Sequence, residues 1–229
     1  PLCIAGGLCK QWLEAKGIYI GAHISSIAGV ADTPFDWISP NLDAVQGNFP
    51  VLDAAAGAQM LAAIEKAKSD GDSVGGTIEC AIIGLPVGLG EPMFGGMESK
   101  LAQILYGIPA VKGLEFGSGF AGSDLRGSQN NDPYTIKDGK IQTETNNAGG
   151  ILGGITTGMP LIFKVAIKPT PSISRQQQSV SLERMEQQEL SVQGRHDPCI
   201  VPRAVPVIEA AAAIAIFDMC LLDGKLLGE

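Results

Sequence analysis

The chain of 229 residues predicts a fold of the α+β class in a single domain. Patterns of helices and of strands both recur in each half of the sequence. Hydrophobic residues make up 45% of the chain, which suffices for one large core, although the length also suits two small domains. Two long polar segments separate the patterned stretches and are predicted to be loops.

Apolar residues at helical spacing predict four helices, at 2–15, 52–73, 98–110 and from Pro206 onward. The first closes at Gly17, and the second ends in two lysines and Gly71, which is typical of helix C-termini. The last is expected to begin near Pro206, because proline suits the first turn of a helix. Its apolar run contains Glu209 and stops at Asp218, so we expect a buried core helix and no membrane span.

Apolar runs bounded by turn-forming residues predict strands at 17–30, 75–92, 111–120, 149–158 and 160–173. The first of these alternates apolar and small residues, as a strand with one covered face does. The second leads into a bend rich in glycine and proline. Residues 32–45 are predicted to be a turn-rich surface connection.

The two polar segments, 121–148 and 171–193, are predicted to be mobile lids. Long loops are uncommon in a compact domain and are often functional. Each is followed by a motif that carries glycine or charge, NNAGGILGG after the first and GRHDPC after the second. Disorder without a function is the alternative.

Charge is distributed unevenly along this acidic chain. The net charge of −8 argues against a nucleic-acid partner. Residues 1–109 hold 5 Lys or Arg and 11 Asp or Glu, whereas residues 160–205 hold 6 and 4. An anionic ligand is therefore expected in the C-terminal half.

The five cysteines are scattered without a CxxC pair, which favours reduced, mostly buried thiols in a cytoplasmic protein over disulfides or zinc. No group of His, Cys and carboxylate residues has metal-ligand spacing, so no metal is expected. His23 has no charged neighbour in the sequence and is predicted to be a structural histidine with satisfied hydrogen bonds. The chain opens directly on an apolar helical pattern, so we expect it to begin partway through a longer protein.

Two motifs could bind an anion. The glycines of NNAGGILGG (146–154) allow a close backbone approach and point N–H groups at a ligand, although tight strand packing explains them equally well. The run matches neither the Rossmann nor the Walker pattern. In KPTPS (168–172), one lysine and two hydroxyls lie on a backbone that two prolines stiffen, which suits a phosphate. A rigid turn after a strand is the alternative there.

The motif GRHDPC (194–199) contains three side chains with different chemical functions. Arg195 offers a planar fork for phosphate or carboxylate, His196 titrates near neutrality, and Asp197 can act as a base. Arg203 follows just before the last predicted helix, whose N-terminus favours anions. The alternative is an Arg–Asp salt bridge that braces a loop.

Together these segments resemble chorismate synthase. The matching stretches, in family order and with family-like spacing, are 75–94, 108–120, 126–132, 146–173 and 194–210. The resemblance implies a β-α-β sandwich with antiparallel sheets around helices, and a cytoplasmic homotetramer. It also implies conversion of 5-enolpyruvylshikimate 3-phosphate to chorismate and phosphate by a 1,4-anti elimination. That reaction needs reduced FMN without net redox change, and supply of electrons by NADPH or by a separate reductant stays open.

The resemblance also implies a set of site residues. FMN contacts are expected at Pro109, Ala110, Gly153, Lys168, Pro169, Thr170, Pro171, Ser172 and Arg195. Catalytic roles are expected for Asp197, which would assist removal of the C6 proton beside the flavin, and for His196. The family's N-terminal glycine–glutamate–serine–histidine–glycine motif is not in this chain. A flavin- or phosphate-binding module without catalysis, or an assembly fragment, is therefore the alternative to an active enzyme.

Overall fold

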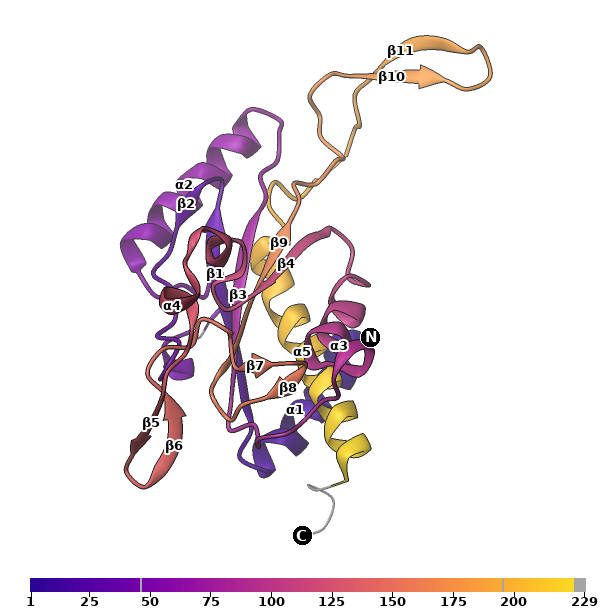
Figure 1. Ribbon diagram of the computed structural model, residues 1–229. Helices are drawn as coiled ribbons and strands as arrows, with labels where there is room; N and C mark the ends of the chain where they lie inside the picture. Colours follow the sequence, from indigo (N-terminus) through magenta and orange to yellow (C-terminus); the bar gives the residue numbers. More distant parts are fainter. Residues whose placement is uncertain (46, 195, 225–229) are drawn as a thin grey trace.

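The computed structural model describes residues 1–45, 47–194 and 196–224 (Figure 1). Its centre is a five-stranded antiparallel sheet in the order β2-β1-β3-β9-β4. In that order the strands are Val30–Ala31, Tyr19–Ile27, Gly76–Ile83, Leu161–Ile167 and Val111–Phe116. Each of these strands lies within or beside a predicted one. The prediction succeeds because the apolar runs are rich in β-branched residues, which fit a pleated, half-buried surface.

Four longer helices and one short helix accompany the sheet. The longer ones are α1 (Leu2–Ala15), α2 (Ala54–Ser69), α3 (Met97–Leu105) and α5 (Val201–Asp223). The short helix α4 (Gly127–Asn130) is followed by the strands of a hairpin, and three 3-10 turns are η1 (Leu42–Ala44), η2 (Met93–Gly95) and η3 (Gly119–Asp124). The α+β class is confirmed. One antiparallel sheet packed on a layer of helices is also what one half of a β-α-β sandwich requires.

The final helix begins earlier than predicted. α5 starts at Val201, with Pro202 in its first turn, so the expected start near Pro206 is wrong and Pro206 lies inside the helix. A proline in the first turn loses no hydrogen bond, whereas Pro206 removes one. Burial of an apolar helix outweighs that loss. α5 is long and apolar enough to cross a membrane by composition, but 56% of that stretch is buried in the domain, as expected of a core helix.

Helices α1 and α5 approach each other closely where Gly6 faces Ala210. A Cβ atom on Gly6 would lie 2.4 Å from the Cβ of Ala210, so the two backbones touch at this point. Farther along, Trp12 and Phe217 pack edge to face with ring centroids 5.0 Å apart. Glycine at position 6 therefore sets the distance between the two helices.

The two predicted loops contain regular structure that the polar composition concealed. In the first, β5 (Tyr134–Lys137) pairs with β6 (Lys140–Thr143) across Asp138 and Gly139, both with positive φ. Asp-Gly is a strong signal for a two-residue hairpin turn. In the second, β10 (Gln177–Ser181) pairs with β11 (Glu186–Leu190), and this hairpin projects away from the body (Figure 1). A third hairpin joins β7 (Ile151–Leu152) and β8 (Ile155–Thr156).

The segment from residue 32 onward is more than a surface connection. Phe35 is buried with Ala81 and Ile162 on the sheet face that does not pack on α5, and Asp32 is buried as well. The expectation of a surface turn over 32–45 is therefore wrong at these two positions. The segment is buried at these positions because it covers one face of the sheet. Without it, the apolar side chains of β3 and β9 on that face would be exposed.

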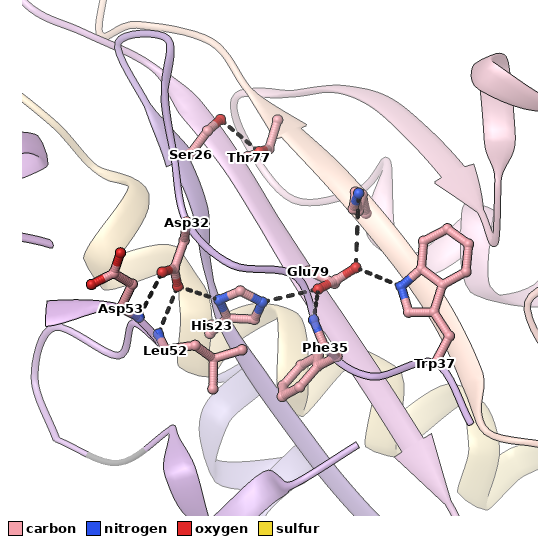
Figure 2. A network of polar contacts seen from close by, with 10 residues as sticks. His23, Ser26, Asp32, Phe35, Trp37, Leu52, Asp53, Thr77 and Glu79 are labelled. Carbon is pink, nitrogen blue, oxygen red and sulfur yellow. Dashed lines mark hydrogen bonds and ion pairs between the residues drawn. The ribbon is translucent and has the colours of Figure 1, made fainter. Parts of the chain in front are cut away.

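His23 lies in a buried ionic network beneath this segment (Figure 2). Its Nδ1 is 2.9 Å from Asp32 Oδ2, and its Nε2 is 3.0 Å from Glu79 Oε2. Glu79 also accepts hydrogen bonds from the Phe35 N–H and the Trp37 indole. The prediction of a satisfied structural histidine is confirmed, but both of its partners are carboxylates that the local sequence did not reveal.

The network follows the register of the sheet. His23 on β1 is paired with Glu79 on β3, Glu79 with Lys164 on β9, and Lys164 with Glu115 on β4. Lys164 Nζ lies 3.8 Å from Glu79 Oε1. Charges of alternating sign therefore run across four strands, which offsets the cost of burying Glu79.

Candidate active site

Three segments meet where β9 ends and β3 and β4 begin. Register places Ile167 beside Gly76 on one side and Val111 on the other. The chain entering β3, residues 70–75, therefore lies next to the chain leaving β9, residues 168–175. The segment 196–199 joins them through a hydrogen bond from Val74 N–H to Pro198 O, at 2.8 Å.

The KPTPS segment contacts the junction of α3 and β4. Lys168 N–H donates to the carbonyl of Ala110 at 2.9 Å, so the predicted cofactor contacts Pro109 and Ala110 lie beside Lys168. Ala110 has a φ of 73°, a left-handed conformation that is strained for a residue other than glycine. Such strain is held in place by surrounding structure and gathers at functional sites.

Thr170, at the centre of KPTPS, has a hydroxyl that is ready to accept or donate a hydrogen bond. Its Oγ1 is buried and has no hydrogen-bond partner among the described residues. Leaving such a group unpaired costs about 1–3 kcal/mol. A ligand atom at this position would remove that cost.

Asp197 has one carboxylate oxygen engaged by the backbone and one in contact with a cation. Oδ1 accepts from Cys199 N–H at 3.3 Å, and Oδ2 lies 3.2 Å from Arg203 Nη1. The contact with Arg203 lacks hydrogen-bond geometry, so the buried Oδ2 has no hydrogen-bond donor in the described part of the chain. Arg203 is itself 82% exposed. Asp197 is thus held in place with one oxygen available.

His196 points toward the base of the second polar segment. Its Nε2 is 3.2 Å from the carbonyl of Val192, and because a carbonyl only accepts, this nitrogen carries the proton. Arg195, expected on an anion, lies outside the described residues. Within those residues, no group of three or more His, Cys, Asp or Glu is placed to hold a metal ion.

Gly153 lies apart from the other predicted site residues. It occupies the turn between β7 and β8, where Gly154 O accepts from Met97 N–H at the start of α3. Ala110 follows the other end of that nine-residue helix, which is roughly 13 Å long at 1.5 Å per residue. A side chain at Gly153 would meet no atom within 4 Å, so the turn faces open space.

The concave surface at the meeting point is small. A cavity of about 200 Å³ is lined by residues of all three segments, among them Asp72, Ser172, His196 and Asp197. It suits a phosphate-sized group, whereas sites for whole cofactors usually measure roughly 300–1,000 Å³. A larger hollow of about 810 Å³ lies among α1, β1 and the start of α5, and Arg203 lines it, whereas the predicted catalytic and cofactor-binding residues do not. Because the predicted site residues Ser172, His196 and Asp197 line the smaller cavity, we take it as the candidate chemical site.

Comparison with known proteins agrees with this geometry. The sequence pattern of chorismate synthase matches residues 1–221. The chain belongs to the chorismate synthase family. It is 48% identical over 223 residues to a chorismate synthase of Dehalococcoides mccartyi and 49% identical over 218 residues to that of Thermococcus gammatolerans. These alignments cover 96% and 95% of this chain, and the chain spans 61% and 60% of those relatives.

A solved chorismate synthase structure shares the fold. The TM-score is 0.79 at 28% sequence identity, over 96% of this chain and 61% of the solved one. The similarity covers the sheet, the helical layer and the segments that meet at the candidate site. The family assignment and the α+β fold therefore do not depend on the motifs alone.

Sequence reasoning missed the segment between α2 and β3. Ser73 Oγ donates to Thr170 O at 2.6 Å, and Asp72 Oδ2 accepts from Arg175 Nη1 at 2.9 Å. The backbone N–H of Ser73, followed by the Arg175 side chain, lowers the pKa of Asp72. The available signal was DGDS, a run of turn formers with two acids directly before a strand.

Proposed function

We propose that this chain forms part of a chorismate synthase that eliminates phosphate from 5-enolpyruvylshikimate 3-phosphate to give chorismate. Family membership over residues 1–221 supports the proposal. The observation that carries it is the pair of buried oxygens without a hydrogen-bond partner, Thr170 Oγ1 and Asp197 Oδ2. Thr170 lies two residues after the cation Lys168, in the same segment as Ser172. A site for a phosphorylated cofactor needs hydroxyl groups such as that of Thr170, and a proton acceptor needs a carboxylate oxygen such as that of Asp197.

The residues present fit the phosphate end of FMN. Lys168 is exposed and cationic, Ser172 lines the small cavity, and the Thr170 hydroxyl lacks a partner. Pro169 and Pro171 hold this segment with little freedom, so ordering it around an anion costs little. Arg195, Pro109, Ala110 and Gly153 complete the proposed contacts. Bound reduced FMN supplies electron density that stabilises the ring as the allylic phosphate departs.

We assign the proton transfer to Asp197. Its Oδ1 is fixed by the Cys199 N–H, which leaves Oδ2 to accept the C6 proton. The Arg203 guanidinium lies 3.2 Å from this oxygen. His196, held on Val192 O through its protonated Nε2, orients the segment and has its Nδ1 available for proton exchange.

The test is Asp197→Asn in the full-length protein. The change keeps the shape of the side chain and removes its basicity, so turnover is expected to fall roughly a hundredfold to ten-thousandfold while FMN binding persists. Asp218→Asn is the matched control, since it makes the same change at an exposed position of α5, far along the helix from the candidate site. Equal turnover in the two variants would refute the assignment of the base.

Residues 1–229 taken alone have a second candidate function. Because the chain spans about three fifths of its curated relatives, it could bind flavin or phosphate without turning over substrate. Purified material that binds FMN and releases no phosphate from enolpyruvylshikimate phosphate would identify this state. Phosphate release would show that the present residues suffice. We also propose the homotetramer and the cytoplasmic location of the family for the whole protein.

A further inference from the structure

We propose that Ser73 is a positioning residue that fixes the spacing between the phosphate-binding segment and the catalytic aspartate. This inference rests on the proposed function, because it assigns Ser73 a role in the same site. Two hydrogen bonds from consecutive residues carry it. Ser73 Oγ donates to Thr170 O at 2.6 Å, and Val74 N–H donates to Pro198 O at 2.8 Å.

The two bonds connect segments that are distant in the sequence. Ser73 and Thr170 are 97 residues apart, and Pro198 directly follows Asp197. Consecutive residues are 3.8 Å apart along the chain, so Ser73 and Val74 set the separation of their partners within narrow limits. The entry to β3 therefore acts as a spacer between Thr170 and Asp197.

Ser73 acts on the orientation of the Thr170 carbonyl at the centre of KPTPS. The rings of Pro169 and Pro171 fix their own φ angles, and each proline restricts the residue before it to extended conformations. The orientation of the Thr170 carbonyl is then set by its partner, the Ser73 hydroxyl. Because the Thr170 side chain rotates with its backbone, this bond also directs the unpaired Oγ1.

Packing on the same segment restricts the spacer further. A Cβ on Gly75 would lie 2.9 Å from Pro169 Cδ and 2.4 Å from Ile167 O, so the two chains are in direct contact there. On the other side of Ser73, the carbonyl of Gly71 accepts from Ser174 N–H at 3.1 Å and from Arg175 N–H at 3.2 Å. With both flanks anchored, loss of the Ser73 hydroxyl should reorient Thr170 and leave the rest of the spacer in place.

Three variants of the full-length protein test the role. Ser73→Ala removes the donor, and Ser73→Thr keeps a hydroxyl. Ser69→Ala is the matched control, because the Ser69 hydroxyl donates to the carbonyl of Lys66 at 2.7 Å within α2 and does not touch the site. The measurements are the FMN dissociation constant from flavin fluorescence, the melting temperature without FMN, and kcat and KM.

Ser73→Ala is expected to bind FMN roughly threefold to tenfold more weakly than Ser69→Ala at an equal melting temperature, as the loss of one hydrogen bond predicts. Its kcat should fall more than its KM rises, and Ser73→Thr should restore both. Equal FMN affinity and equal kcat in Ser73→Ala and Ser69→Ala would overturn the role, as would a Thr variant that behaves like Ala. If Asp197→Asn also retained turnover, the proposed function itself would fail. If Asp197→Asn lost turnover while Ser73→Ala behaved like Ser69→Ala, only the spacer role of Ser73 would be rejected.

Discussion

The Nε2 atom of His23 lies 3.0 Å from Oε2 of Glu79, directly across the β1–β3 ladder. The opposite ring nitrogen faces Asp32 at 2.9 Å. Each ring nitrogen of His23 therefore faces a carboxylate, and the ring joins strand β1 to the covering segment and to the neighbouring strand.

Replacement of His23 by Asn should destabilise the fold strongly. The change leaves two buried carboxyl groups without their shared partner, and breaking a buried ionic contact costs about 3–5 kcal/mol. Lys66→Ala is the control, since its ion pair with Asp70 is exposed and should contribute at most about 1 kcal/mol. Urea denaturation measures both free energies of unfolding. Similar losses in the two variants would contradict the network's role.

Glu79 should make stability depend on pH in the acid range. Burial by itself raises the pKa of Glu79, but hydrogen bonds from His23 and Phe35 N–H and the charge of Lys164 lower it overall, below its usual 4.5. A glutamate whose pKa is lowered in the folded state stabilises the fold at pH values above its pKa in the unfolded chain, about 4.3. That contribution is lost as pH falls through the folded value.

The free energy of unfolding, measured in urea at several pH values, should therefore decline below about pH 4.3. Glu79→Gln should be less stable at neutral pH and show a shallower decline. An unchanged pH slope in this variant would assign the acid sensitivity to other carboxylates.

Gly6 and Gly7 provide a matched pair in helix α1. Gly6→Ala should destabilise by roughly 1–3 kcal/mol, because its Cβ would overlap Ala210. A Cβ on Gly7 would meet nothing within 4 Å, so Gly7→Ala should stabilise by about 0.5–1 kcal/mol through helix propensity. Thermal melting compares the two. A stabilising Gly6→Ala would show that the helices can separate without cost.

Cysteine reactivity should follow burial. All five thiols are free. Burial raises the pKa of Cys80 and the pKa of Cys199, and it raises the pKa of Cys220 to about 11. At about pH 8, iodoacetamide should modify exposed Cys3 first and these three slowly, since the thiolate is the nucleophile. Mass spectrometry in concentrated urea should then detect five modified sites. Rapid modification of Cys80 in the folded protein would contradict the buried core.

The two hairpin segments are proposed to act as lids. The β10–β11 hairpin projects from the body, and every residue of β11 is exposed (Figure 1). Amides of 177–190 should exchange rapidly without ligand and slow when FMN and substrate bind, because ordering would bury them. Hydrogen exchange monitored by mass spectrometry measures this change. Identical exchange with and without ligands would assign the hairpin another role.

The sequence by itself determined the local features. Apolar spacing located α1 at residues 2–15, and two lysines with Gly71 marked the end of α2. Five stretches, among them those that contain KPTPS and GRHDPC, indicated the family through their resemblance to chorismate synthase. Helix periodicity and proline stiffness depend on neighbouring residues, which is why they can be read along the chain.

Only the tertiary structure decided which distant residues meet. Strand register placed Glu79 beside His23 and brought Ser73 to Thr170, and neither pairing leaves a trace in local composition. The length of α3 separated Gly153, near the start of this helix, from Ala110 beyond its end. Burial also moved the start of α5 to Val201, because an apolar helix packed on a sheet gains more than one lost hydrogen bond at Pro206 costs.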